Sequence, residues 1–213
     1  YSSDATILRL YPQGRGGNIF TILEGVAAIA ESAFYGTKNL LGIVLPDSLN
    51  TIGDRAFERS GLIELTLPAS VTTLGKAPFS GSSRLTNFYV QDGSPVFSTV
   101  SGLLYSADAQ TLLAYPAGRS AAEFTVPDGT QGISQSAFEG AANLTRIVLP
   151  DSVTTLGTGA FEGATSLSDI QFGAGVTSLP ERAFAQTGFS TMAIPAAITR
   201  IGSEAFEGSG NLS

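Results

Sequence analysis

The chain has 213 residues and a net charge of −7, from 18 acidic and 11 basic side chains, and it contains no Cys, His or Trp. These absences exclude disulfides, thiolate nucleophiles, imidazole bases and the common nitrogen and sulfur metal ligands, and the acidic balance argues against nucleic acid as a partner. Apolar residues make up 43% of the chain, enough for a folded core. No apolar run approaches the roughly 18 residues of a membrane span, so we expect no membrane insertion by this segment.

Residues 1–12 match the turn and second strand of a predicted β-hairpin that is complete at residues 102–115. In the complete copy, two apolar runs flank the polar turn Ala107–Gln110, a pattern typical of a hairpin. The copies share two tyrosine positions, Tyr1 and Tyr11 in the first and Tyr105 and Tyr115 in the second. Their recurrence favours packing within an enlarged coil, and contact with a ligand is the alternative.

A phenylalanine recurs along the chain, preceded by Ala or, once, by Pro. Its intervals are 22 or 23 residues, apart from one of 59 residues that contains the predicted hairpin. The position is occupied by Phe34, Phe57, Phe79, Phe138, Phe161, Phe184 and Phe206. Such spacing predicts tandem coils whose aromatic side chains stack in a common core.

One repeat unit shows what each coil contains. Ile147 and Leu149 alternate as in a half-buried strand, and Pro150 ends that strand because it has no amide hydrogen to donate. Val153 and Leu156 then supply further inward anchors before the next Phe.

The array also repeats on a longer scale. Residues 1–58 align without a gap on residues 105–162, which predicts duplicated blocks at 1–104 and 105–208 in one array of about eight coils. The chain begins inside a predicted hairpin and ends where a new strand is expected to start, at Leu212. We therefore expect both termini to be cuts within a longer array.

A string of the type Ile-x-Leu-Pro-x-Ser-Val-x-x-Ile-Gly-x-x-Ala-Phe occurs at residues 43–57, 147–161 and 194–206. Together with the hairpin coil, it resembles the BspA-like branch of leucine-rich repeat proteins. For residues 1–213 the resemblance implies a β-rich (α/β) solenoid. This would be a right-handed coil with 22–23-residue repeats, a parallel β-sheet on one face and short turns or helical turns on the other.

Members of that family are mostly found on bacterial surfaces and on some parasitic protists, and they are associated with adhesion to host matrix proteins or to other cells. The resemblance therefore implies a non-enzymatic extracellular or cell-surface recognition module that binds a protein or glycan partner. A passive structural spacer and an accessory repeat region of a larger surface enzyme are the alternatives.

In such a solenoid, the side chains that alternate with the buried ones point outward from the sheet. The outward face is expected to begin with Ile19, Thr21, Gly42 and Val44 and to end with Thr191 and Ala193. The candidate partner-binding residues lie between them: Glu64, Thr66, Asn87, Tyr89, Glu123, Thr125, Arg146, Val148, Asp169 and Gln171. Tyr89 and Arg146 are the expected anchors, and an ordinary solvated sheet face is the alternative.

Carboxylates recur near the Phe position, at Glu31, Asp54, Glu58, Glu139, Glu162, Glu181, Glu204 and Glu207. Because they recur with the array, we interpret them as solvated turns rather than catalytic pairs. The sequence contains no Asp-rich calcium loop. We therefore expect no catalytic residue, no metal site and no cofactor.

Overall fold

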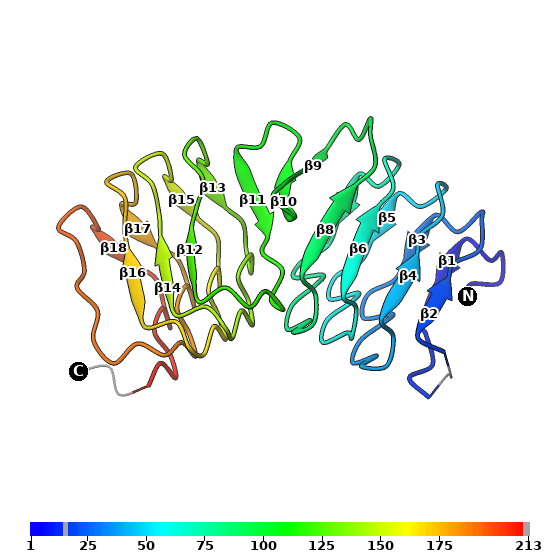
Figure 1. Ribbon diagram of the computed structural model, residues 1–213, viewed down its shortest axis with the longest axis horizontal. Helices are drawn as coiled ribbons and strands as arrows, with labels where there is room; N and C mark the ends of the chain where they lie inside the picture. The colour runs from blue at the N-terminus through cyan, green and yellow to red at the C-terminus, as the bar shows by residue number, and fades with distance from the viewer. Residues whose placement is uncertain (15–16, 211–213) are drawn as a thin grey trace.

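The computed structural model describes residues 1–14 and 17–210. In that part of the chain, eighteen short β-strands wind into an elongated solenoid of about eight turns (Figure 1). No helix forms there, so none among these residues is long and apolar enough to cross a membrane. The coils are closed by short turns, and the helical turns considered as an alternative do not occur among the described residues.

One face of the solenoid, called the strand face below, carries the first strand of most coils. Its strands are β2 (Ile19–Thr21), β4 (Gly42–Val44), β6 (Glu64–Leu67), β8 (Asn87–Val90), β12 (Glu123–Thr125), β14 (Arg146–Val148) and β16 (Asp169–Gln171). The pairing is parallel, and it places Phe124 beside Ile147 and Ile147 beside Ile170. Equivalent residues of successive coils therefore lie in rows across the face.

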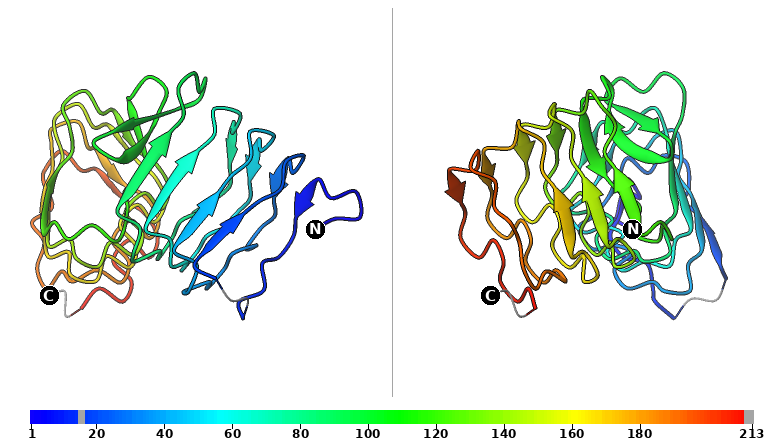
Figure 2. Two further views of the ribbon diagram at one scale, coloured as in Figure 1. Left: turned by 45° about the vertical axis from the view of Figure 1, so that its right-hand side comes forward. Right: turned by 60° about the vertical axis from the view of Figure 1, so that its left-hand side comes forward.

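A second face also carries parallel strands, so the sheet is not confined to one face as we expected (Figure 2). These strands are β1 (Ile7–Leu8), β3 (Ala28–Ile29), β5 (Thr51–Ile52), β7 (Thr73–Leu74), β13 (Gly132–Ile133), β15 (Thr155–Leu156), β17 (Ser178–Leu179) and β18 (Arg200–Ile201). Most follow the turn after the first strand, where β-branched residues favour extended backbone. At the start of β15, for example, the amides of Thr154 and Thr155 both donate to the Gln131 carbonyl of the preceding coil.

The enlarged coil contains three antiparallel strands rather than two. They are β9 (Phe97–Val100), β10 (Leu103–Ser106) and β11 (Thr111–Ala114), and β11 also pairs in parallel with β13. Strands β10 and β11 lie within the predicted hairpin at 102–115, whereas β9 was not predicted. The β10–β11 turn is held by Asp108, whose carboxylate accepts from Ser106 Oγ and from the Gln110 amide.

The same turn occurs at the N-terminus. Asp4 accepts from Ser2 Oγ and the Thr6 amide, and these hydrogen bonds lower the pKa of Asp4 to about 2 because they favour the ionised carboxylate. The segment then continues into β1, which pairs with β3 as β11 pairs with β13. The structure of the first residues thus matches the turn and second strand of the hairpin.

The repeated phenylalanines form a stacked spine inside the solenoid. Phe34, Phe57, Phe79, Phe138, Phe161 and Phe184 are buried, and Phe206 is half-buried at the C-terminal end. Ring centroids are 5.0 Å apart between Phe138 and Phe161 and again between Phe161 and Phe184. These are stacked pairs, which contribute beyond their buried area.

Tyrosines of the hairpin copies extend this spine. Tyr11 stacks on Phe34 at 5.3 Å, and Tyr115 stacks on Phe138 at 4.9 Å. Tyr105 is also buried, and its hydroxyl lies 3.3 Å from Thr130 Oγ1. Tyr1 is exposed. Packing therefore accounts for three of the four recurring tyrosines.

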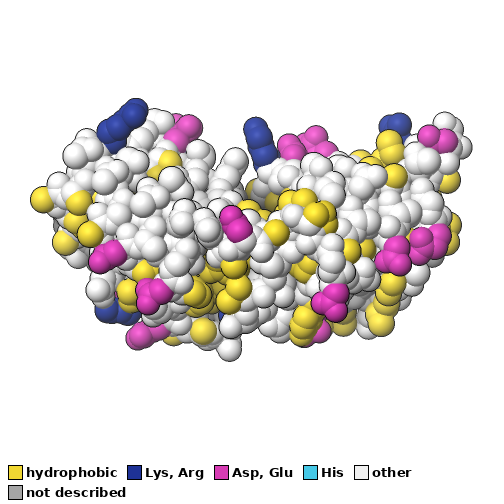
Figure 3. Space-filling view, turned by 90° about the horizontal axis from the view of Figure 1, so that it is seen from above, with side chains coloured by type: hydrophobic (Ala, Val, Ile, Leu, Met, Phe, Trp, Pro, Cys, Tyr) yellow, Lys and Arg dark blue, Asp and Glu magenta, His cyan; other side chains and the backbone are white. Residues whose placement is uncertain are grey.

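The stacking of the aromatic rings is interrupted between the two halves of the chain, since no described ring contact joins Phe79 to Tyr115 or Phe138. On the second face one sheet ends at β7 and the next begins with the three-stranded segment, and on the strand face the described strands β8 and β12 do not pair. The buried apolar side chains form two clusters that meet in the enlarged coil, where Phe97 and Leu104 belong to the first cluster and Leu103, Tyr105 and Leu112 to the second. Seen from above, apolar side chains surround a hollow in the middle of the molecule (Figure 3).

The last coil departs from the prediction. Thr191 and Ala193 were expected to continue the strand face, but residues 191–193 form no strand and do not pair with β16. This coil packs against a described neighbour on one side only, so fewer contacts hold its backbone extended. The strand expected to start at Leu212 lies outside the described residues.

We expect Phe161→Ala to lower the free energy of unfolding by about 3–5 kcal/mol, because it opens a cavity between two stacked rings. Phe206→Ala should cost clearly less, since Phe206 is half-buried and stacks on one side only, against Phe184. Urea unfolding followed by circular dichroism measures both. Equal losses would contradict a spine whose stability depends on neighbours on both sides.

Candidate functional site

The strand face presents most of the predicted outward residues to solvent. Glu64, Thr66, Tyr89, Glu123, Thr125, Asp169 and Gln171 are exposed, and Asn87, Arg146 and Val148 are half-buried. The residues that alternate with them, such as Leu65, Phe88 and Ile147, are fully buried. The period of two along each strand therefore separates core from surface as expected.

The interruption between the two halves divides this face into two groups. The described strands β8 and β12 have no Cα atoms within 8 Å of each other. Between them lies the three-stranded segment, which is tied to β8 by a 2.9 Å hydrogen bond from the Phe88 amide to the Gly102 carbonyl. The candidate residues on β6 and β8 thus form one surface, and those on β12, β14 and β16 form another.

The first group combines an aromatic side chain with a carboxylate. Tyr89 Oη donates to Glu64 Oε1 at 3.3 Å, and Asn87 Nδ2 donates to the same oxygen at 3.5 Å. The negative charge of Glu64 raises the pKa of Tyr89, because it disfavours the phenolate. The hydrogen bond to Glu64 therefore orients the Tyr89 hydroxyl on the surface.

Two further exposed apolar side chains lie on β2 and β4, in the same half of the strand face as Tyr89. Ile19 is 71% exposed, Val44 52% and Tyr89 45%. Thr66 lies beside Tyr89 in the register of β6 and β8, and β4 with Val44 packs against β6. The candidate set begins at Glu64, so sequence reasoning left Ile19 and Val44 outside it although it placed both on the face.

The second group is dominated by an ion pair. Arg146 on β14 contacts the Asp169 carboxylate on β16, and Glu123 on β12 lies beside Arg146 on the other side. Both partners are partly exposed, and such pairs contribute little to stability. Arg146, one of the two expected anchors, is thus already bound to a carboxylate of its own chain.

The carboxylates on the turns are not all solvated, which corrects the interpretation given above. Glu58 is only 5% exposed and is paired with Arg55 and Arg59. The Glu162 carboxylate binds Arg182 of the next coil at 2.8 Å. These carboxylates therefore tie coils and turns together, whereas Glu31 and Glu181 are exposed as predicted.

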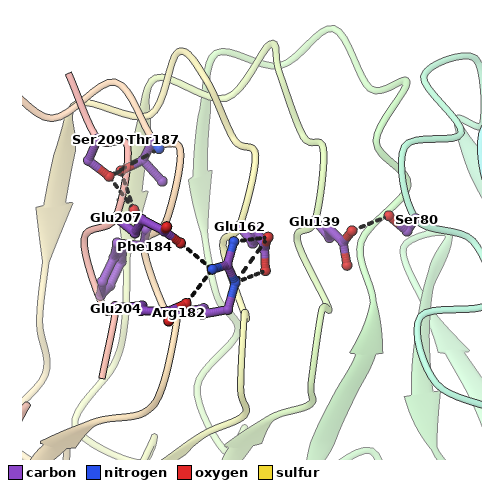
Figure 4. Close-up of polar contacts among 9 residues, drawn as sticks. All are labelled: Ser80, Glu139, Glu162, Arg182, Phe184, Thr187, Glu204, Glu207 and Ser209. Atoms are coloured by element: carbon purple, nitrogen blue, oxygen red, sulfur yellow. Dashed lines mark hydrogen bonds and ion pairs between the residues drawn. The ribbon is translucent and has the colours of Figure 1, made fainter. Parts of the chain in front are cut away.

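Arg182 is the centre of the larger network, shown in Figure 4. Besides Glu162, it contacts Glu204 at 2.5 Å and Glu207, both of the following coil. The hydrogen bonds that Arg182 donates to these carboxylates raise its pKa, because they favour the charged guanidinium. Among the described residues no group of three or more acidic side chains is arranged to hold a metal ion.

Arg119 was missed by sequence reasoning. Its guanidinium donates to the Thr86 carbonyl at 3.2 Å and to the Ser101 carbonyl, so it joins β8 to the three-stranded segment. The equivalence of Gly118-Arg119 with Gly14-Arg15 in the duplicated alignment could have pointed to it. Arg15 lies outside the described residues.

Six copies of the BspA type leucine rich repeat region match residues 17–102 and 117–213, so the chain belongs to this family. Among curated protein sequences, none matches the chain. Among solved structures, the chain is similar to a leucine rich cell surface protein from Faecalibacterium prausnitzii A2-165, with 35% identity and a TM-score of 0.81 over 92% of this chain. It is also similar to the pneumococcal vaccine antigen PcpA, with 26% identity and a TM-score of 0.81 over 91% of this chain.

The chain spans about half the length of these two structures, 52% of the first and 48% of the second. A leucine-rich repeat protein from Eubacterium ventriosum shares the fold, with 19% identity and a TM-score of 0.55 over 90% of this chain and 76% of its own.

We expect Glu64→Gln to lower the pKa of Tyr89 toward its ordinary value of about 10, because the substitution removes the adjacent negative charge. NMR titration of the Tyr89 ring measures the change. Glu123→Gln, which removes a carboxylate from the other group, should leave the pKa of Tyr89 unchanged. An unaltered titration in the Glu64→Gln variant would show that the two side chains are apart in solution.

We expect Arg119→Ala to accelerate amide hydrogen exchange in β9 and β10, since it removes the hydrogen bonds that tie this segment to β8. The local loss should be about 1–3 kcal/mol. Arg84→Ala, at an exposed arginine nearby, is the matched control. If both variants exchange like the wild type, Arg119 does not hold the segment in place.

Proposed function

We propose that this chain is a non-enzymatic recognition module of a cell-surface protein, and that it binds a protein partner through the strand face of its N-terminal half. The observation that carries the proposal is the presence of three exposed apolar side chains, Ile19, Val44 and Tyr89, on the strands of this half of the face. Aromatic side chains that are partly exposed on a well-packed support are typical interface anchors.

The chemistry of the face favours a protein over a glycan. Protein interfaces have an apolar centre with a polar rim, and Val44 and Tyr89 with Glu64 and Asn87 beside them offer both. Tyr89 is the only aromatic side chain on the described strands of the face that is exposed. The C-terminal group, with Glu123 and the Arg146–Asp169 pair, would contribute charge selectivity rather than binding energy.

The cell-surface assignment is supported by the names of the two similar structures, a cell surface protein and a vaccine antigen. The non-enzymatic assignment is supported by the sequence, which lacks the imidazole and thiol groups that most often serve as base and nucleophile. Recurrence of the carboxylates in structural ion pairs supports the same reading, since these groups already have a role in stacking the coils.

The test is binding of the purified chain to immobilised extracellular-matrix proteins by surface plasmon resonance, with a glycan array run in parallel. We expect binding to at least one matrix protein. Val44→Asp and Tyr89→Ala should each weaken it by about tenfold or more, because they charge or truncate the centre of the interface. Both positions are exposed, so both variants should stay folded.

Ser178→Asp is the control, because it places a carboxylate at an exposed strand position on the second face. It should bind like the wild type. No binding to any matrix protein, or binding that survives both strand-face substitutions, would overturn the proposal and favour a passive spacer or an accessory region of a surface enzyme. Binding to glycans alone would overturn the choice of a protein partner.

A further inference from the structure

The interruption between the two halves leaves backbone amides without acceptors. Elsewhere the amide at the Phe position donates to the next coil, as from Phe57 to the Pro78 carbonyl at 2.8 Å and from Phe138 to the Ala160 carbonyl at 2.8 Å. After Phe79 this ladder stops. No described residue accepts a hydrogen bond from the amides of Ala77 or Phe79.

The backbone at Ala77 resembles that of its hydrogen-bonded equivalent in the preceding coil. Ala77 has φ +46°, close to the +51° of Arg55 one coil earlier. The Arg55 amide donates to the Lys76 carbonyl at 2.9 Å. Because Ala77 holds the equivalent position with a similar φ, we infer that its amide points in the same direction, away from the preceding coil, where no described residue accepts from it.

The edge of β7 is free on the same side. Thr73 and Gly75 donate their amides to Asn50 and Ile52 of the preceding coil, so the amide and carbonyl of Leu74 point the other way. Among the described strands, no Cα atom of β9, β10 or β11 lies within 8 Å of a Cα atom of β7. Paired strands are about 4.8 Å apart, so the space beside β7 exceeds one strand spacing.

This space is a cavity of about 590 Å³ with a mainly apolar lining, to which Thr72, Thr73, Ser134 and Gln135 add uncharged polar groups. Its apolar walls include Leu74 and Phe79 from one half and Phe97, Leu104 and Leu113 from the enlarged coil. Figure 3 shows apolar side chains around the hollow. One acidic and one basic residue, Asp54 and Lys76, also line it, so the lining carries no net charge.

A buried hydroxyl without a partner lies beside the cavity. Tyr115 is buried, and its Oη makes no hydrogen bond. Tyr115 lines a small space of about 20 Å³ together with Ala77 and Phe79, whose amides are the free ones. Unpaired polar groups in an apolar site cost free energy unless a ligand pairs with them.

The opening is braced by contacts between the halves. Ser80 Oγ donates to the Glu139 carboxylate (Figure 4), and the Gly118 amide donates to the Leu85 carbonyl at 2.8 Å. Gly140 packs so closely on Gly81 that a Cβ there would lie 2.9 Å from the Gly81 Cα. The halves therefore touch at the turns while β7 and β11 stay apart, and the cavity is preformed.

We propose that this junction groove, formed by Leu74, Ala77, Phe79, Phe97, Leu104 and Leu113, binds an extended, uncharged peptide segment with apolar side chains. The peptide adds as a strand to the free edge of β7, where one of its carbonyls accepts from the Leu74 amide, and beyond the end of β7 further carbonyls accept from the turn amides of Ala77 and Phe79. Its apolar side chains fill the cavity. An unpaired strand edge with a pocket beside it is the arrangement used in strand addition.

This site is separate from the one in the proposed function. The groove lies beside β7 on the second face, whereas Val44 and Tyr89 lie on the strand face. Substitutions on the strand face therefore leave the groove intact, and the two proposals can fail independently.

The probe is a phage-displayed library of random linear peptides, selected on the intact chain. We expect enriched peptides with alternating apolar residues and no net charge. Added as a synthetic peptide, such a sequence should slow hydrogen exchange at the Leu74, Ala77 and Phe79 amides. The equivalent amides of Arg55 and Phe57, which are already hydrogen-bonded, should not change.

Leu74→Pro and Leu74→Ala form a matched pair. Both remove the leucine side chain, but only Leu74→Pro also removes the amide that points into the groove, a change that an edge strand tolerates. We expect Leu74→Pro to bind the peptide about tenfold more weakly than Leu74→Ala, because a carbonyl of the peptide is left unpaired. Leu113→Trp, which fills the cavity, should abolish binding. Thermal unfolding checks that each variant is folded.

Several results would overturn the proposal: no enriched peptide, equal affinity of the two Leu74 variants, wild-type affinity of Leu113→Trp, or a bound peptide that leaves the three amides unprotected. If Tyr89→Ala lost binding while Leu113→Trp bound the peptide fully, the peptide would lie on the strand face. That result would also overturn the proposed groove. If Leu74→Pro is unfolded, the comparison of Leu113→Trp with the wild type decides.

Discussion

The structure depends on one constraint, which is that each coil must stack on the next in register. The amide at the Phe position donates to the next coil, and the aromatic ring stacks on the ring of that coil, so both interactions require the same spacing. Phe138, Phe161 and Phe184 satisfy both at once. Neither face of the solenoid has a core of its own; each coil buries its apolar side chains only because a neighbour covers them.

The same constraint explains the charged groups of the turns. A carboxylate at a fixed position in each coil lies close to the coils before and after it, where an arginine can bind it. Arg182 contacts Glu162 of the preceding coil and Glu204 and Glu207 of the following one. A recurring carboxylate in a repeat protein is thus placed to lock coils together, and recurrence alone does not indicate solvation.

The functional surfaces arise where the repetition is incomplete. On the strand face, the outward side chains do not pack in the core, so they differ from coil to coil. Val44 and Tyr89 are exposed apolar groups among them. At the junction, the enlarged coil displaces the next coil from β7 and leaves the amides of Ala77 and Phe79 unpaired. A regular array would expose unpaired amides only at its two ends, so the enlarged coil creates an internal strand edge.

The sequence by itself determined the repeat, the stacked Phe positions and the alternation on the strand face, because spacing along the chain is enough to define them. The tertiary structure decided what depends on neighbours far apart in the chain. The second sheet forms because the amides of Thr154 and Thr155 donate to the carbonyl of Gln131, which lies 23 or 24 residues earlier in the chain. Thr191 stayed outside any strand although its sequence resembles one. The junction groove could not be predicted from the sequence either. It is defined by hydrogen bonds that β7 and Phe79 do not make, and the pattern of residue types along the chain does not indicate which amides lack an acceptor.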